Sequence, residues 1–229
     1  MPTTQAYKIS GPAGAIELQV TSPQQQTSRL AVLCHPHPLY GGSMYDAVLE
    51  LAATALLAQS ISVVRFNFRG VGGSEGISGR GTEDERQHAS YSPVEVGDLL
   101  AVLDWVSTER PAAKALGVGY SFGANVLWQA QPLCAMEQIL LIAPPTAAMA
   151  FDANSTAKTQ QVSAVWCAHD DFVDPQRFGA DPEVACTELA SGGHFFSGQA
   201  HGLTETVITF LKKGSEHQSR INADIASST

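Results

Sequence analysis

Residues 119–124 have the sequence Gly-Tyr-Ser-Phe-Gly-Ala, in which Ser121 stands between two glycines with one residue on either side. An apolar run over 115–120 favours a strand, and a helical pattern over 122–131 follows it. A serine at such a turn has a strained backbone, and the glycines beside it let strand and helix approach closely. The segment predicts either a serine nucleophile or a structural glycine-rich turn, and we favour the nucleophile.

The rest of the chain alternates short apolar runs with patterns of helical period. Further strands are expected over residues 6–10, 15–20, 30–34, 62–66, 138–143, 162–168 and 184–189. Further helices are expected from Ser43, from the Ser92-Pro93-Val94-Glu95 capping box, and over 203–213 with an end at Gly214. Apolar strands alternating with helices are typical of an α/β fold with a mostly parallel sheet covered on both faces. We expect one domain over residues 1–213 and a polar, mobile tail over 214–229.

The composition limits the classes of function. The chain has 229 residues, of which 44% are hydrophobic and 15% charged, and its net charge of −9 argues against nucleic acid or an anionic membrane as partner. We expect no signal peptide and no membrane span, because no apolar run of the required length is present. Four widely spaced cysteines without a Cys-x-x-Cys pair argue against a zinc ribbon and favour free thiols in the cytoplasm. Monomer and homodimer both remain open.

A nucleophilic serine at a strand-to-helix turn requires an acid and then a histidine base later in the chain. His194 lies in the loop Ser-Gly-Gly-His-Phe-Phe after the last expected strand, followed by apolar residues that exclude water. His201 is the alternative, although its place at the start of the last helix suits a cap. We expect His194 to be the base.

The acid is expected after the strand over 162–168, where Asp170 and Asp171 are adjacent. An aspartate there accepts a hydrogen bond from the imidazole, fixes its tautomer and stabilises the imidazolium. We choose Asp170. Asp171 remains the alternative and Asp174 a more distant one, since one of the adjacent pair can simply cap a turn.

The loop over residues 35–42 has the sequence His-Pro-His-Pro-Leu-Tyr-Gly-Gly. An oxyanion hole takes one backbone N–H from the residue after the nucleophile, here Phe122, and a second from an early strand-to-helix loop. Because the two prolines have no N–H, the amide of His37 is the expected second donor. A metal site at His35 and His37 is the competing interpretation, but no third ligand at an obvious spacing supports it.

Several motifs resemble a known family when they are taken in order. They are CHPHPLYGGSM (34–44), RFNFRGVGGSEG (65–76), GYSFGA (119–124), APP (143–145), HDDFVD (169–174) and GGHFF (192–196). Over roughly residues 29–212, the chain resembles a small, lidless branch of the α/β-hydrolase superfamily, similar to dienelactone hydrolases and compact bacterial esterases. The resemblance implies that fold without a cap domain, and a Ser-His-Asp triad at Ser121, His194 and Asp170.

The residue at the nucleophile position narrows the chemistry. Dienelactone hydrolases have cysteine there, and the dehalogenases and epoxide hydrolases of this fold have aspartate, so Ser121 argues against all three. About 18 residues separate the strands that end near 143 and begin near 162, too few for a helical cap. We expect an open site for a small ester substrate, without metal or cofactor. The apolar pocket is expected to contain Leu39, Tyr40, Met44, Phe172, Phe195 and Phe196.

These residues are compatible with more than one function. The expected one is a carboxylesterase that acts on small or short-acyl-chain esters through an acyl-enzyme at Ser121. A thioesterase or amidase with the same triad is the first alternative, and a non-catalytic binding protein of this fold is the second. Arg69 and Ser74 are expected to order loops beside the site. Residues 77–91 are either a solvated loop or a flap over it.

Overall fold

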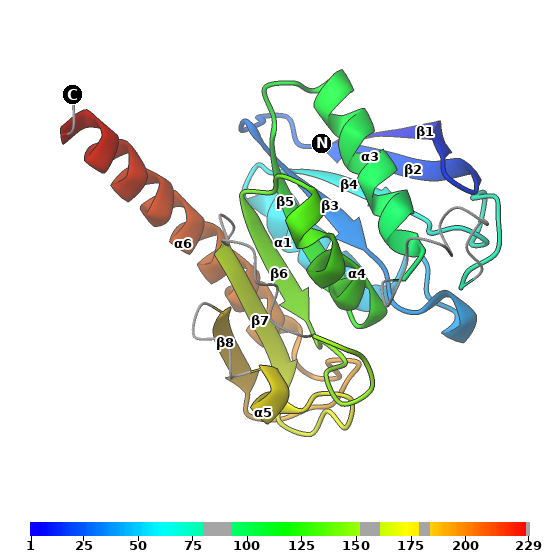
Figure 1. Cartoon of the computed structure of the whole chain (residues 1–229). Helices are drawn as coiled ribbons and strands as arrows, with labels where there is room; N and C mark the ends of the chain where they lie inside the picture. Colours follow the sequence, from blue (N-terminus) through cyan, green and yellow to red (C-terminus); the bar gives the residue numbers. More distant parts are fainter. Residues whose placement is uncertain (80–92, 152–160, 179–183, 228–229) are drawn as a thin grey trace.

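The computed structural model describes residues 1–79, 93–151, 161–178 and 184–227, with the backbone alone for 215–227 (Figure 1). The strands are β1 (Thr3–Gly11), β2 (Gly14–Ser22), β3 (Arg29–Cys34), β4 (Ser62–Phe66), β5 (Lys114–Tyr120), β6 (Gln138–Ile142), β7 (Gln161–Cys167) and β8 (Val184–Leu189). The helices are α1 (Ala47–Ala58), α3 (Glu95–Glu109), α4 (Phe122–Ala130), α5 (Pro175–Phe178) and α6 (Ala200–Ser227), with short 3₁₀ turns η1 (Pro38–Tyr40) and η2 (Gln131–Leu133).

The strands form one sheet in the order β1-β2-β4-β3-β5-β6-β7-β8. β1 and β2 make an antiparallel hairpin at one edge, and β2 is antiparallel to β4. All later pairs are parallel, from β3 with β4 to β7 with β8. All five residues of β6 are buried, because helices cover the central strands on both faces. The expected mostly parallel α/β sheet is confirmed.

Two apolar cores lie on opposite faces of the sheet. α3 and α4 pack on one face, where Phe66, Leu99 and Trp128 belong to one buried cluster. α1 and α6 pack on the other face, where Leu49 and Phe210 belong to a second cluster (Figure 1). α1 and α3 each bury an apolar stripe and expose polar residues, whereas α4 is buried over almost its whole length between α3 and the sheet.

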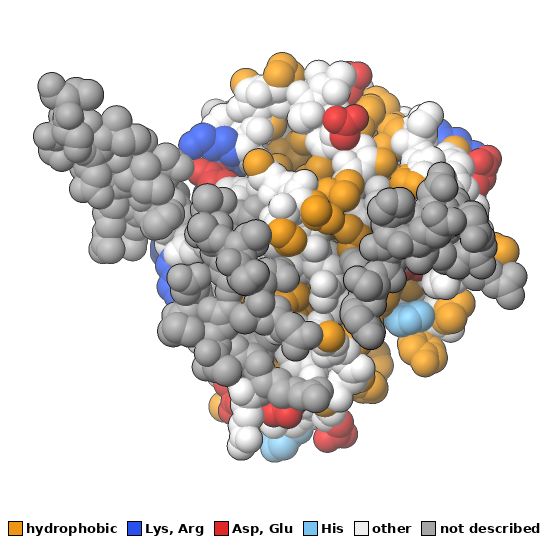
Figure 2. All heavy atoms as spheres, in the orientation of Figure 1, with side chains coloured by type: hydrophobic (Ala, Val, Ile, Leu, Met, Phe, Trp, Pro, Cys, Tyr) orange, Lys and Arg blue, Asp and Glu red, His pale blue; other side chains and the backbone are white. Residues whose placement is uncertain are grey.

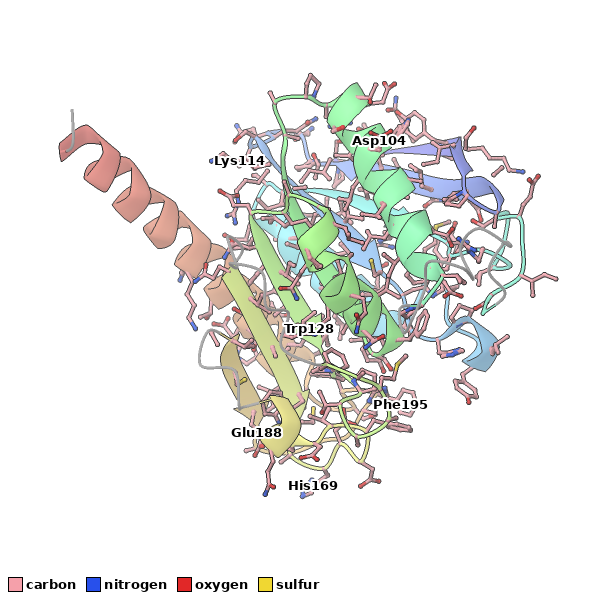
Figure 3. All side chains as sticks on the ribbon, in the orientation of Figure 1. Asp104, Lys114, Trp128, His169, Glu188 and Phe195 are labelled. Atoms are coloured by element: carbon pink, nitrogen blue, oxygen red, sulfur yellow. The ribbon has the colours of Figure 1, made fainter. Side chains whose placement is uncertain are left out.

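Parallel strands direct four loops to the same edge of the sheet. β3 ends at Cys34, β5 at Tyr120, β7 at Cys167 and β8 at Leu189. Figure 3 labels Phe195 among the loops at these carboxyl ends and Lys114 at the opposite, amino end of the strands. The candidate nucleophile, acid, base and oxyanion loop follow these four strands, so the topology brings them to one place.

The start of α1 and the end of α6 differ from expectation. α1 begins at Ala47 instead of Ser43, because the Asp46 carboxylate caps it, accepting from the amides of Val48 (2.8 Å) and Leu49 (3.4 Å). α6 does not end at Gly214 but continues to Ser227.

Gly214 is explained by packing. A Cβ there would collide with the Gln138 side chain, whose Nε2 donates to the Phe210 carbonyl (2.9 Å). The glycine thus permits close approach to the sheet and is not a helix stop. α3 begins at Glu95 with Val94 as its N-cap and no side-chain cap bond, later than the expected capping box at Ser92-Pro93-Val94-Glu95. Ser92 itself lies outside the described residues, as do residues 80–91 of the possible flap. None of the helices in the described ranges is both long and apolar enough to cross a bilayer.

Candidate active site

Ser121 lies on the sharp turn between β5 and α4. Its backbone has φ 53° and ψ −118°, a strained conformation for a residue with a side chain, and its amide donates to the Ile142 carbonyl (2.9 Å). A Cβ at Gly119 would collide with the backbone of Gly123, and one at Gly123 with the backbone of Cys34. The two glycines are therefore required for strand and helix to approach, and the serine side chain stands at the helix N-terminus.

Three polar side chains from different loops meet at this turn. Ser121 Oγ lies 2.9 Å from His194 Nε2, and His194 Nδ1 lies 3.0 and 2.9 Å from the two Asp170 carboxylate oxygens. A carboxylate can only accept, so Nδ1 carries the proton and Nε2 is left to accept from the serine hydroxyl. The Asp170 carboxylate is buried and also accepts from the Phe172 amide (3.0 Å). The imidazole is thereby oriented toward the serine.

The other candidate acids and base lie elsewhere. Asp171 and His201 are exposed. Asp174 Oδ1 accepts from the Gln176 amide (3.0 Å) at the start of α5. The structure therefore brings together the first choice at each position and leaves each alternative outside the hydrogen-bonded group.

The loop that carries His194 is fixed by a hydrogen bond from β5 and by a buried phenylalanine, and two aromatic rings pack against the imidazole. The Tyr120 hydroxyl donates to the His194 carbonyl (3.0 Å), and the neighbouring Phe196 is buried in the core. The Phe172 ring centroid lies 4.7 Å from that of His194, and the Phe195 centroid 5.6 Å. These rings limit the access of water to the imidazole.

The loop over residues 35–42, the candidate oxyanion loop, is fixed by His35, which is fully buried. Its Nε2 accepts from the Phe68 amide (3.0 Å) and its Nδ1 donates to the Pro36 carbonyl (2.7 Å), which describes a neutral imidazole. Burial lowers the pKa of His35 to about 4. Both ring nitrogens are occupied, and the described residues contain no group of three side chains suited to hold a metal ion. The competing metal interpretation of this loop therefore has no ligand set in the described part of the chain.

The amides expected to form an oxyanion hole are both available. The His37 side chain accepts from the Leu39 amide (3.2 Å) through Nδ1, which shapes the turn. Phe122 begins α4, where a backbone N–H has no partner within the helix. Within the described ranges, neither the His37 amide nor the Phe122 amide donates to a protein acceptor.

Arg69 and Ser74 order the neighbouring segment, as expected. Arg69 is buried and bonds Asp98 of α3 through Nη2 (2.8 Å) and through its backbone amide (3.0 Å). Ser74 Oγ donates to the Asn67 carbonyl (2.7 Å) and accepts from the Glu17 amide (2.9 Å). These bonds tie the segment after β4 to α3 and to β2.

A cavity of about 610 Å³ opens beside Ser121 and His194. It is lined by Pro36, His37, Tyr40, Gly41, Gly42, Asp46, Tyr120, Ser121, Phe122, Pro145, Ala148, Met149, Phe172, His194 and Phe195. Three of the six residues expected to line the pocket do so: Tyr40, Phe172 and Phe195.

The other three expected pocket residues point elsewhere. Leu39 is 72% exposed, on the outside of the η1 turn. Met44 is 1% exposed, and its amide donates to Asn67 Oδ1 (2.9 Å), which holds it in the interior before α1. Phe196 is 2% exposed and packs in the cluster beneath the loop.

The sequence reasoning missed one wall of the cavity. Pro145, Ala148 and Met149 line it from the segment after β6. That segment is joined to the loop that carries Asp170, because the Ala147 amide donates to the Phe172 carbonyl (3.0 Å). The position of Ala-Pro-Pro at the carboxyl end of a parallel strand is the signal that points to it.

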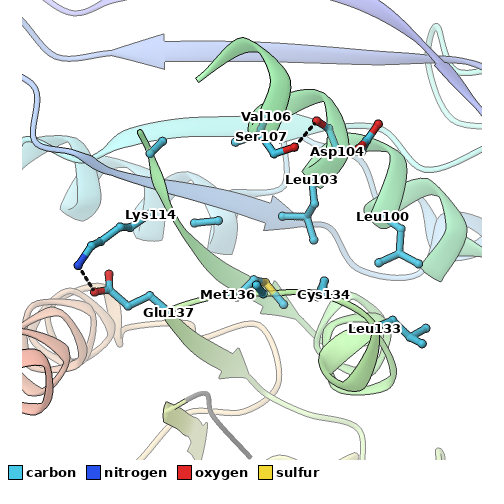
Figure 4. Close-up of a pocket in the computed structure, with 13 residues that line it drawn as sticks. Leu100, Leu103, Asp104, Val106, Ser107, Lys114, Leu133, Cys134, Met136 and Glu137 are labelled. Carbon is cyan, nitrogen blue, oxygen red and sulfur yellow. Dashed lines mark hydrogen bonds and ion pairs between the residues drawn. The ribbon is translucent and has the colours of Figure 1, made fainter. Parts of the chain in front are cut away.

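A second cavity of about 640 Å³ lies between α3, η2 and the start of β5 (Figure 4). Figure 2 shows hydrophobic side chains gathered at the centre of this face of the molecule. The charged lining residues of this second cavity include Lys114 and Glu137, whose Nζ and Oε1 atoms lie 3.3 Å apart. Its only thiol among the described residues is Cys134, and burial raises the pKa of that group to about 11. Although slightly larger, this crevice has no activated nucleophile, and the cavity at Ser121 is the candidate active site.

Known proteins share this arrangement of strands and loops. The model of the "Alpha/beta hydrolase family" matches residues 31–200. The chain belongs to the α/β-hydrolase family. An α/β serine hydrolase homologue from Coxiella burnetii is 31% identical, over 90% of this chain and 96% of that one, with a TM-score of 0.76. XC6422 from Xanthomonas campestris, an α/β serine hydrolase without lid, is 28% identical over 93% and 96% of the two chains, with a TM-score of 0.80.

A relative by sequence is the uncharacterized protein RP471 of Rickettsia prowazekii. It is 36% identical over 142 residues, which are 60% of this chain and 54% of that protein. The chain thus spans about half the length of this relative. Together with the lidless structure, the matches confirm the resemblance to small α/β serine hydrolases.

Proposed function

We propose that the protein is a carboxylesterase that cleaves small or short-acyl-chain esters through a Ser-His-Asp triad. The observation that carries the proposal is the pair of contacts made by His194, with Ser121 Oγ at 2.9 Å and with the Asp170 carboxylate at 2.9 Å. An imidazole held in this tautomer accepts the serine proton as the hydroxyl attacks a carbonyl carbon.

The reaction follows from these positions. Ser121 Oγ attacks the ester carbonyl while His194 Nε2 takes its proton, and Asp170 stabilises the imidazolium. The amides of Phe122 and His37 donate to the tetrahedral oxyanion, each contributing about 3 kcal/mol. His194 then protonates the departing alcohol. Water, deprotonated by His194, attacks the acyl-enzyme and releases the acid.

The shape of the site supports a preference for small acyl groups. The cavity of about 610 Å³ is apolar on the sides formed by Pro145, Met149 and Phe172. It is modest among ligand cavities, which span about 300–1,000 Å³. A long acyl chain would extend past Phe195, which is largely exposed, into solvent. Added methylenes beyond the cavity gain little burial and do not raise the rate.

The test is hydrolysis of p-nitrophenyl acetate, butyrate, octanoate and palmitate by the wild type and by Ser121→Ala. The wild type is expected to cleave acetate and butyrate fastest, and Ser121→Ala to lose at least about 10³-fold in kcat, because a methyl group cannot attack. Circular dichroism and thermal unfolding verify that the variant is folded.

A second measurement separates an esterase from a binding protein. A fluorophosphonate that reacts with activated serines is expected to label the wild type and not Ser121→Ala. If folded wild type neither cleaves an ester nor takes the label, the esterase proposal is wrong and a non-catalytic binding role replaces it. If it takes the label but cleaves only thioesters or amides, the leaving group has been misassigned.

A further inference from the structure

The candidate active site carries an acidic group that the proposed mechanism does not use. Asp46 lines the cavity beside Ser121 and His194, and no lysine or arginine is among the described residues that line it. The His37 side chain also lines the cavity, and burial lowers the pKa of its imidazole. Among the described lining residues, Asp46 therefore has no permanently charged cation beside it.

Only one of the two carboxylate oxygens of Asp46 accepts a hydrogen bond from the described residues. Oδ1 accepts from the Val48 and Leu49 amides, whereas Oδ2 accepts from no residue in the described ranges. Burial raises the pKa of Asp46, and those two bonds and the field of His194 oppose the rise. A half-buried carboxylate with a vacant acceptor gains from a positive group, because the cation offsets the lost hydration.

Aromatic rings form part of the same lining. The centroid of the His37 ring lies 4.9 Å from that of Tyr40 and 4.7 Å from that of Phe122. The rings of Phe172 and Phe195, which also line the cavity, flank His194. Aromatic faces attract cations, alkylammonium groups in particular, and do so more strongly where water is excluded.

We propose that the cavity binds the cationic end of an ester substrate, an alkylammonium group, between the Asp46 carboxylate and the aromatic wall. This subsite rests on the proposed esterase function, since the ester that bears the cation is cleaved at Ser121. The net charge of −9 favours the approach of a cation and disfavours that of an anionic ester. Asp46 is then a specificity-determining residue: esters with a carboxylate end are rejected by it.

The test is competition by phenyltrimethylammonium in the hydrolysis of p-nitrophenyl butyrate, with wild type and Asp46→Asn. Asparagine retains the helix cap but not the charge. The cation is expected to inhibit the wild type competitively, with an inhibition constant about tenfold lower than in Asp46→Asn. Benzoate, a similar ring with the opposite charge, is expected to bind the wild type more weakly than Asp46→Asn.

A matched control removes a carboxylate at a distance. Asp104→Asn changes the net charge by the same amount on α3, beside the second cavity, and is expected to leave both inhibition constants unchanged (Figure 4). If both inhibitors shift by the same factor in Asp46→Asn, or if Asp104→Asn has the same effect, the subsite is overturned while the esterase stands.

Calorimetry separates failure of the subsite from failure of the esterase. If folded wild type does not hydrolyse the ester, the proposed function is overturned, and titration of phenyltrimethylammonium into wild type and Asp46→Asn decides the subsite alone. Binding that weakens about tenfold in the variant supports it. Equal or undetectable binding to both proteins overturns it.

Discussion

The hydroxyl of Tyr120 donates to the backbone carbonyl of His194 over 3.0 Å, and this bond joins the serine turn directly to the loop that carries the imidazole. Tyr120 is the residue before Ser121, so the strand that positions the serine also supports the histidine. Burial and the nearby Asp46 and Asp170 carboxylates raise the pKa of the phenol, which therefore remains a donor throughout the neutral range. This bond therefore contributes, with the Asp170 contact, to the distance between Ser121 and His194.

Tyr120→Phe is expected to lower kcat about 3- to 10-fold with little change in KM, because the imidazole loop loses its support while the cavity wall is retained. Stability is expected to fall by about 1 kcal/mol, the value of one hydrogen bond. Steady-state kinetics and urea denaturation measure the two effects. Tyr7→Phe is the matched control, since among the described residues its hydroxyl bonds only the exposed Gln5 side chain. Equal kinetics for both variants would show that the bond has no role in positioning.

Asp170→Asn is expected to reduce kcat on the order of 10³–10⁴-fold, because an amide can present its N–H₂ to His194 Nδ1 and reverse the tautomer. Asp171→Asn changes the adjacent, exposed carboxylate and is expected to retain activity within about twofold. The pair is compared by kcat on p-nitrophenyl butyrate. A larger loss of kcat in Asp171→Asn than in Asp170→Asn would show that Asp171, and not Asp170, is the acid.

The strands and the residues that meet at their ends were predictable because both depend on local pattern. Apolar runs identify buried parallel strands, and the order of serine, acid and histidine along the chain places each in a loop at the same edge. The choice between Asp170 and Asp171 could not be made from the local sequence pattern. Only the fold shows that one is buried against His194 and the other is exposed.

The cavity wall was harder to predict, because the direction of a loop side chain depends on distant partners. Met44 is turned inward by a bond from its amide to Asn67, and nothing in its own neighbours indicates this. Met149 lines the cavity because Thr146 Oγ1 bonds the backbone of Asp174, which fixes two loops together. Gly214 is likewise required by the close approach of the Gln138 side chain from β6, and not by the end of its own helix.

Gly123→Ala is expected to cost about 3 kcal/mol of stability or more, since the added Cβ would meet the backbone carbonyls of Cys34 and His35. Backbone cannot rotate away as a side chain can. Gly202→Ala is the control, because its Cβ would meet only the ends of the Gln199 and Leu189 side chains, at 3.0 and 3.2 Å. That change is expected to stay within about 1 kcal/mol. Urea denaturation compares them, and similar losses would contradict the close-approach argument.

His35 is expected to make stability depend on pH in a defined window. Burial lowers its pKa to about 4, whereas in the unfolded chain the imidazole titrates near 6.5. Between these values the unfolded state binds the proton and the folded state does not, so the free energy of unfolding falls as the pH drops from about 6.5 to about 4. The shift corresponds to about 3 kcal/mol, fully present above pH 6.5.

The pH effect is measured by urea denaturation of wild type and His35→Gln from pH 7.5 to pH 4. The variant is expected to be less stable at neutral pH, because glutamine cannot reproduce the two bonds of the ring, to the Phe68 amide and the Pro36 carbonyl, in the same geometry. It is also expected to lose most of the wild-type slope within the window. His169→Gln removes an exposed imidazole and is expected to keep that slope. A slope that persists unchanged in His35→Gln would mean that other groups carry the acid sensitivity and that His35 does not hold the oxyanion loop as a neutral imidazole.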